Sequence, residues 1–280
     1  MHVSCPQIWK PDFRDLSIES LALMMSLANI CAGCRYLVID ETGVLTAAIL
    51  ERGKPDRETD LRLGASVFVL CENLQPYTDI LKYFPHLQKY AQPEASGPTS
   101  ENTPSFHSLD FLSALHPDTV TITPPIEGPL YERKLKTYNM HVETNRIWNA
   151  GGFDGFLSAT SYDPTSYIAK CIERVSLSGN VVVYSQYREP ITELQNHALT
   201  KMPTRPILGP TIHEIRATRW CTFKGRARPE MLGRGGGGWI FSGTRVEEGI
   251  FDQQNINRSK RQKVESNGTE VEDTHLEGSA

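Results

Sequence analysis

The sequence predicts an α/β fold with a mostly parallel sheet, and three features support this prediction. The stretch CRYLVIDETGVLTAAILERG, residues 34–53, has the composition of a strand, a turn and a helix. Strand and helix segments then alternate along most of the chain, which favours parallel strands with right-handed crossovers. The last two strand segments have no helix between them, which favours an antiparallel hairpin at the sheet edge. Six or seven strands in this arrangement are typical of the Rossmann-like methyltransferase fold.

Each element is assigned from its local pattern. The first half is expected to hold a helix over residues 17–30 with Ser17 as N-cap, a strand over 36–39, a helix over 45–52, a strand over 65–70, a helix over 77–84, a short helix over 109–115 and a strand over 119–124. The second half is expected to hold a charged helix over 130–148, a strand over 153–159, a helix that begins at Asp163-Pro164, a strand over 180–186, a helix over 190–201, and strands over 211–223 and 237–246.

The domain organisation follows from composition. We expect an irregular lead-in over residues 1–14 and one methyltransferase-like domain over residues 15–250. A segment over about 90–108 is rich in Pro, Ser, Thr, Asn and Gly, which predicts a disordered insertion in that domain. Residues 251–280 are polar and predict a disordered tail.

Charge and cysteine content limit the function classes. The net charge of −4 gives no overall basic bias toward nucleic acid, so any RNA contact has to come from a local patch. There is no apolar leader and no run long enough to cross a bilayer, which predicts a soluble, intracellular protein. Among six cysteines only Cys31 and Cys34 have redox or metal spacing. No second pair completes a zinc site, so we expect ordinary reduced thiols and no metal.

The turn after the first strand decides whether this unit could bind S-adenosylmethionine (SAM). Such a site needs two or three glycines, because the backbone must approach the ligand at the positive end of the following helix. This turn has Gly43 alone, followed by Val44 and Leu45. We therefore predict a degenerate turn at Asp40 and Gly43 that keeps the shape of a cofactor site and binds no cofactor.

Two acidic residues could still take part in methyl transfer. Glu72 follows the second strand and could bind the ribose of SAM, or it could be a solvent-facing loop acid. Asp163 could pass for a catalytic acid, but a role as helix cap explains it and Pro164 without chemistry. There is no GxSxG, GxxxxGK[ST] or HExxH motif, and no catalytic residue is assigned.

The stretch FKGRARPEMLGRGGGGWIFSGTRV, residues 223–246, carries a local basic patch. Candidates for contact with RNA phosphates are Lys224, Arg226, Arg228 and Arg234. The glycines at 235–238 open a strand and not a helix, so a phosphate cradle is disfavoured. The alternative is a glycine bulge beside a solvated basic loop. The apolar residues 239–241 could meet a partner chain or fill the core.

The polar tail holds a second basic cluster. Its cations are Arg258, Lys260, Arg261 and Lys263. They are candidates for a nuclear-import patch, although short basic runs are also common on solvated tails. The expected location is the nucleus.

Three stretches together resemble one family. They are SLANICAGCRYLVIDETGVLTAAILERG, FDGFLSATSYDPTSYIAKCIERVSLSGNVVVYSQYREPITEL and RPEMLGRGGGGWIFSGTRV. Their order and spacing over about residues 15–250 resemble the non-catalytic subunit of the tRNA (adenine-58-N1)-methyltransferase. The segments VVVYSQYREP and GGGGWIFSGTRV are the most specific.

The resemblance implies a paralogue of the catalytic subunit that kept the methyltransferase fold and lost the SAM site. It implies pairing with that subunit, two copies of each, and help in binding tRNA, while the partner uses SAM to methylate N1 of adenine 58 in the T-loop. Members of the family carry an N-terminal domain before the first helix predicted here, so the chain could be a fragment, a truncated gene product or a shortened member. The alternative is an active SAM-dependent RNA methyltransferase with a degenerate glycine turn, which requires Glu72 as a ribose ligand.

Overall fold

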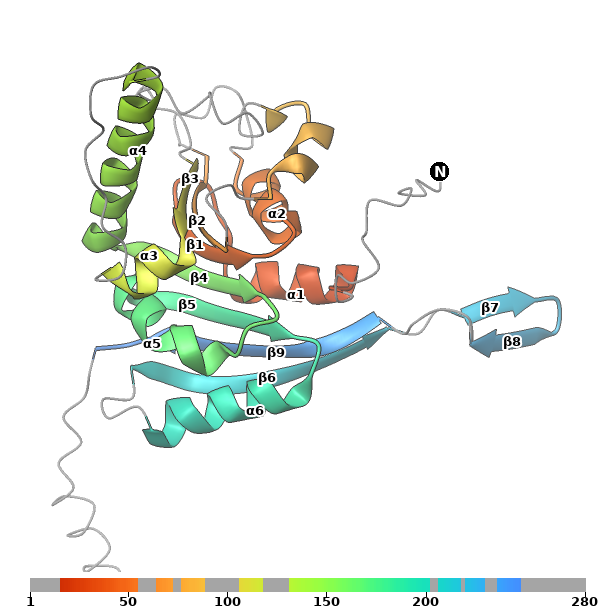
Figure 1. The fold of residues 1–280 in the computed structure, drawn as a ribbon. Coiled ribbons are helices and arrows are strands. Elements are labelled where there is room, and N and C mark those ends of the chain that lie inside the picture. Colours follow the sequence, from red (N-terminus) through yellow and green to blue (C-terminus); the bar gives the residue numbers. More distant parts are fainter. Residues whose placement is uncertain are drawn as a thin grey trace, which may run out of the picture.

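The computed structural model describes residues 16–54, 64–72, 77–88, 106–117, 131–201, 206–217, 220–229 and 236–247. Seven strands form one sheet in the order β3-β2-β1-β4-β5-β9-β6 (Figure 1). They are β1 (Arg35–Asp40), β2 (Ser66–Cys71), β3 (Phe106–Asp110), β4 (Phe153–Ala159), β5 (Val175–Ser185), β6 (Ile207–Ala217) and β9 (Gly236–Arg245). The first five strands are parallel, and β9 is antiparallel to both β5 and β6. The predicted methyltransferase-like sheet with a terminal antiparallel hairpin is confirmed.

The helices lie on both faces of this sheet (Figure 1). They are α1 (Ile18–Leu27), α2 (Val44–Arg52), the 3₁₀ helix η1 (Asp79–Tyr83), α3 (Phe111–Leu115), α4 (Tyr131–Ala150), α5 (Pro164–Arg174), α6 (Arg188–Asn196) and the π-helical turn η5 (His197–Lys201). Both predicted N-caps are confirmed, since Ser17 accepts from the N–H of Ser20 and Asp163 from that of Thr165. No helix in the described part of the chain is both long and apolar enough to cross a membrane.

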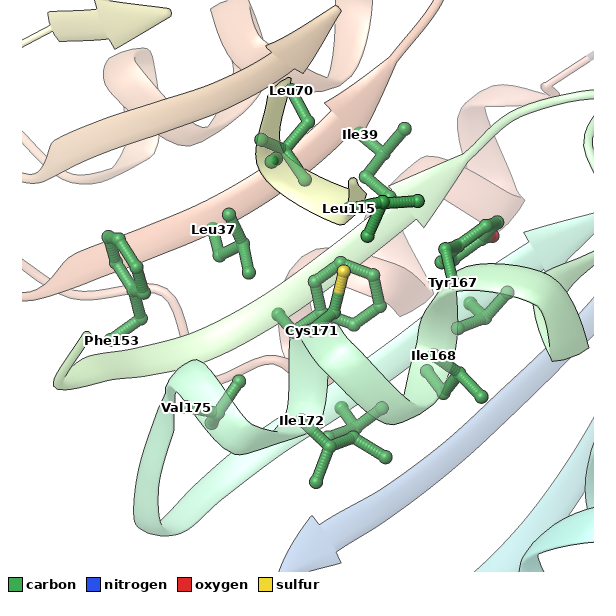
Figure 2. Packing of buried hydrophobic residues seen from close by; sticks show 14 of the residues in the cluster. Leu37, Ile39, Leu70, Leu115, Phe153, Tyr167, Ile168, Cys171, Ile172 and Val175 are labelled. Carbon is green, nitrogen blue, oxygen red and sulfur yellow. The ribbon is translucent and has the colours of Figure 1, made fainter. Parts of the chain in front are cut away.

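Two apolar cores lie on opposite sides of the sheet, because successive residues of a strand face opposite ways. In β1, Leu37 and Ile39 belong to the core under α3, α4, α5 and α6, whereas Tyr36 and Val38 belong to the core under α1 and α2. Figure 2 shows the first core, in which residues 167–172 of α5 pack against the sheet. The two cores, one on each face of the sheet, fix the relative positions of the parallel strands and of their carboxyl ends.

Several local expectations differ from the structure, and among them the strand expected from residue 180 begins at Val175. Residues 106–108 belong to β3 and pair with β2, so this end of the predicted insertion is wrong. The helix expected from 109 begins at Phe111, because Asp110 caps it by accepting from the N–H of Ser113. The segment 77–84 forms a short 3₁₀ helix. The strand expected over 211–223 is divided, since β6 ends at Ala217 and a separate strand, β7 (Trp220–Phe223), follows.

Several expectations fall outside the described residues. They concern the lead-in over residues 1–14, the insertion over 90–105, the strand over 119–124 and the tail over 251–280.

Candidate functional site

The natural ligand position in this fold is the crevice at the carboxyl ends of the parallel strands, where the strand order reverses. Here the reversal falls between β1 and β4, which are neighbours in the sheet although a large part of the chain separates them. The predicted residues Asp40, Gly43 and Glu72 all lie at this end. Asp40 is the last residue of β1, Gly43 precedes α2, and Glu72 directly follows β2.

Asp40 occupies the start of helix α2 with its own carboxylate. The side chain is buried, with 4% of its surface exposed. One oxygen accepts from the backbone N–H and the hydroxyl of Thr42, at 2.9 and 3.0 Å, and the other accepts from the N–H of Thr46 at 2.9 Å. Free N–H groups at a helix start are what make such a position attractive to an anionic ligand. In this turn the protein supplies the anion itself.

Gly43 is required by a close approach of the protein to itself. Its φ is +80°, in the left-handed region that favours glycine. A Cβ atom added here would lie 2.0 Å from the carbonyl oxygen of Tyr77 and 3.2 Å from the side chain of Ile80. The segment that begins at Tyr77 therefore lies directly against the turn. The glycine admits this backbone, where a SAM site would use glycine to admit the cofactor.

A hydrogen-bonded link joins the carboxyl ends of β1 and β4 at the reversal point. One carboxylate oxygen of Glu41 accepts from the backbone N–H of Ser161 at 2.6 Å and from its hydroxyl at 2.7 Å. Glu41 follows β1 and Ser161 follows β4, so the link spans the two strands between which a ligand would enter. Hydrogen bonds to a charged acceptor are among the stronger ones in proteins.

Glu72 lies against the tyrosine that follows Ser161. Burial, followed by a hydrogen bond to the Glu72 carboxylate, raises the pKa of Tyr162 to about 12. The Tyr162 ring also stacks on Phe111 at 5.7 Å between ring centroids. Glu72 is exposed at the position expected of a ribose ligand, but its carboxylate already has a partner within the chain.

These contacts do not fit a SAM site built on a glycine turn. Protein backbone covers the single glycine, an internal carboxylate accepts from the helix start, and a hydrogen-bonded pair joins the loops that follow β1 and β4. Asp163 serves as a helix cap at 3.1 Å from the N–H of Thr165, as predicted. Among the described residues no group of three or more His, Cys, Asp or Glu side chains could hold a metal ion.

The Cys31–Cys34 pair lies before β1, away from this edge. Both thiols are free, with their sulfur atoms 3.0 Å apart. Burial and the hydrogen bond to Cys31 raise the pKa of the Cys34 thiol to about 11, so it is protonated at neutral pH. A thiol in this state is a poor nucleophile and a poor metal ligand.

The basic patch has a defined structure in its first part. Lys224, Arg226 and Arg228 lie on a two-stranded antiparallel hairpin formed by β7 and β8 (Arg226–Pro229). All three side chains are exposed. In Figure 1 this hairpin projects beyond the end of the main sheet. Arg234 lies outside the described residues, so the structure does not show whether it joins the other three.

The glycines of β9 meet an aromatic ring and the next strand. A Cβ atom at Gly238 would lie 2.3 Å from the ring of Tyr184, and one at Gly237 would lie 3.0 Å from the carbonyl oxygen of Ile215. The Tyr184 hydroxyl donates to the carbonyl of Gly237 at 2.9 Å. Both glycines pair with β6 in regular register, so the glycine bulge given as the alternative is not found at these two positions.

The residues after these glycines belong mainly to the core. Ile240 and Phe241 are fully buried, on opposite faces of the sheet. The suggestion that they meet a partner chain is therefore wrong for both. Trp239 is half-buried under the guanidinium of Arg188, which lies 5.2 Å from the ring centroid.

Sequence reasoning missed most of the residues that close the strand ends. Glu41, Tyr77, Ser161 and Tyr162 were given no role. Polar residues directly after two strands were the available signal. Their pairing was not, because Glu41 and Ser161 are 120 residues apart in the sequence.

The comparisons with known proteins agree with the fold. Residues 12–139 match the Gcd10p family. A SAM-dependent O-methyltransferase from Thermotoga maritima superposes with a TM-score of 0.51 at 11% identity, covering 83% of this chain and 66% of that one. A precorrin-6Y C5,15-methyltransferase from Geobacter metallireducens gives a TM-score of 0.51 at 9% identity, covering 85% of this chain and 93% of that one. At such identities the likeness shows a methyltransferase-like fold alone.

Curated relatives share more of the sequence. Two fungal proteins named tRNA (adenine(58)-N(1))-methyltransferase non-catalytic subunit TRM6 are similar over most of this chain. The one from Candida glabrata is 30% identical over 90% of this chain and 55% of its own length, and the one from Debaryomyces hansenii is 28% identical over 90% and 52%. The chain thus spans about half the length of these relatives. Its resemblance to the non-catalytic subunits of tRNA (adenine-58-N1)-methyltransferase, first drawn from three sequence stretches, is confirmed together with the match to the Gcd10p family.

Proposed function

We propose that this chain is a non-catalytic, tRNA-binding and scaffolding subunit of the complex that methylates N1 of adenine 58 in the T-loop of tRNA. Its partner is the catalytic subunit, which binds SAM, and the complex contains two copies of each chain. The observation that carries the proposal is the set of contacts at the carboxyl edge of the sheet, where Asp40 accepts from the start of α2, Glu41 accepts from Ser161, and the Tyr77 backbone lies against Gly43. The relatives named as non-catalytic subunits support the same role.

The test is co-expression with the catalytic subunit, purification through a tag on this chain, and a methylation assay on unmodified tRNA. Each subunit alone serves as a control. We expect co-purification and activity in the complex only. Activity from this chain alone would overturn the proposal. Co-purification without activity would support the scaffold and refute the claim that this length of chain is enough to place tRNA.

The alternative, an active enzyme with a degenerate turn, needs Glu72 free to bind a ribose. In the structure the Glu72 carboxylate lies close enough to the Tyr162 phenol to raise its pKa, and the Tyr77 backbone lies against the turn at Gly43. No further observation favours this alternative, and we propose that no cofactor is bound here.

For tRNA binding we propose the basic patch as the contact. Replacing Arg226 and Arg228 with Ala should weaken tRNA binding evenly across tRNA sequences. It should also flatten the dependence of log Kd on log salt by up to roughly two units, because each cation releases about one counterion from a phosphate. Replacing Arg133 and Lys136 of α4 removes the same charge elsewhere and controls for net charge. An unchanged slope in the Arg226/Arg228 variant would refute phosphate contact by this patch.

The location is a separate proposal. We propose that Arg258, Lys260, Arg261 and Lys263 form the nuclear-import patch. Replacing all four with Ala in a fluorescent fusion of the full chain should move the protein out of the nucleus. Full nuclear retention of that variant would refute this assignment.

A further inference from the structure

The β7–β8 hairpin has two chemically different faces. In an antiparallel pair, residues directly opposite each other point to the same face, and the face alternates along the strand. Phe223 lies opposite Arg226 and Cys221 opposite Arg228, which places these four residues on one face. Trp220 lies opposite Pro229 and Thr222 opposite Ala227, which places those four on the other. We call the first the cationic face.

The cationic face joins an exposed ring to two arginines. The Phe223 side chain is 60% exposed, and the Arg228 guanidinium lies 5.6 Å from its ring centroid. Arg226 flanks the ring from the directly opposite position on β8. Lys224 stands beside them at the turn, where Gly225 has a φ of +75°. A ring with two arginines of β8 beside it is therefore presented to solvent near the tip of the hairpin.

The charge of the hairpin is uncompensated. Residues 220–229 contain Lys224, Arg226 and Arg228 and no Asp or Glu. Within the described parts of the chain none of these three cations forms an ion pair. An isolated two-stranded hairpin is marginally stable at best. An exposed aromatic ring and three clustered cations add little to its stability, because none of them is buried. The exposed ring and the three cations suit the binding of a polyanion that carries planar aromatic groups.

We propose that the cationic face binds an unpaired stretch of RNA, with one base stacked on Phe223 and adjacent phosphates held by Arg226 and Arg228. This rests on the proposed tRNA-binding function, to which it adds the class of nucleotide bound and the residue that takes the base. Stacking on an aromatic side chain requires a base with a free face, which loops and single strands offer and a continuous duplex does not. Arginine beside the ring binds phosphate through a planar, forked donor set.

The test compares two RNA probes on the full chain. Fluorescence anisotropy is measured with an unstructured single strand of about 12 nucleotides and with a blunt duplex of the same sequence. Phe223→Leu should weaken single-strand binding roughly 5- to 100-fold, leave the salt dependence unchanged and leave duplex binding within twofold. Trp220→Leu removes an equally exposed ring from the other face and should change single-strand binding less than twofold. Thermal melting confirms that both variants keep the folded domain.

The outcomes separate this inference from the function on which it rests. If Arg226→Ala/Arg228→Ala flattens the salt dependence but Phe223→Leu has no effect, the hairpin binds RNA by charge alone and the stacking proposal is overturned. If neither variant changes RNA binding, the assignment of the patch fails as well. Equal losses from Phe223→Leu and Trp220→Leu would overturn the one-face arrangement. A polyglutamate peptide that binds and loses affinity to the same extent in Phe223→Leu would show an acidic protein site instead.

Discussion

At the scale of single residues, the turn after β1 is held by contacts within the chain itself. Asp40 satisfies the start of α2, and Gly43 lies beneath the backbone of Tyr77. Both residue types also occur in turns that bind a cofactor. Their identity alone therefore does not distinguish a working cofactor turn from a degenerate one. The difference lies in the groups that contact these two residues. Here those groups belong to the protein, namely the Thr46 N–H and the Tyr77 carbonyl.

The contact at Gly43 predicts a large effect of one methyl group. Gly43→Ala should lower the free energy of unfolding by about 1–3 kcal/mol for the left-handed backbone, and by about 1–3 kcal/mol more because the Tyr77 carbonyl must move. Gly209→Ala is the matched control, since Gly209 has a φ of +60° and open space around its Cβ position. Urea denaturation of both variants measures the difference. Equal losses would show that Tyr77 does not press on the turn.

His107 predicts a dependence of stability on pH. Burial lowers its pKa, the charge of Glu143 opposes this, and the charge of Arg35 adds a smaller decrease. The unfolded state then binds more protons than the folded state between the usual histidine pKa of about 6.5 and the lower folded value. The free energy of unfolding should therefore fall as pH drops through this window.

The control for this effect is His107→Gln, which removes the titrating group. Urea denaturation at pH 7.5 and at several values below 6.5 should show a smaller decrease for the variant than for the parent chain. Parallel pH profiles of the two proteins would contradict the assignment to His107.

At the scale of elements, the antiparallel end of the sheet depends on β9 lying against Tyr184 of β5. Gly238→Ala would place a methyl group 2.3 Å from the ring as it stands, and should lower the free energy of unfolding by about 1–3 kcal/mol. In a Tyr184→Ala background the same change should cost less, because the ring is gone. A double-mutant cycle measures this coupling. Additive losses would refute the contact as the reason for glycine.

Elements with strong local signals could be predicted from the sequence, and weak ones could not. The run FDGFLSA forms β4 at the expected bounds, since six of its seven residues are buried. Helix α5 begins where expected, because Asp163 caps it and Pro164 suits its first position. The strand β3 was missed because FHSLD is short, half polar, and pairs only with β2 at the sheet edge. The β7–β8 hairpin was missed because its β7 residues continue the apolar pattern of β6.

The candidate site could be predicted only in part for a related reason. The shortage of glycine at residues 40–43 is visible in the sequence and led to the prediction of a degenerate turn. The closing contacts, Glu41 with Ser161 and Gly43 with Tyr77, join segments that tertiary folding alone brings together. Local patterns carry no information about such pairs.

At the scale of the whole molecule, the chain keeps a methyltransferase-like architecture, its loops contact one another at the carboxyl edge of the sheet, and its β7–β8 hairpin carries three exposed cations. The net charge of −4 means that attraction to RNA depends on where the basic side chains gather. The scaffold role that we propose would need a rigid sheet, a partner that supplies the cofactor, and a local surface for the nucleic acid.

The most direct test of this account is equilibrium dialysis of labelled SAM against this chain alone, with the co-purified complex as the positive control. We predict no saturable binding by the chain alone and saturable binding by the complex. Saturable binding by the chain alone that is lost in Glu72→Ala would contradict the account and establish Glu72 as a ribose ligand in a working SAM site.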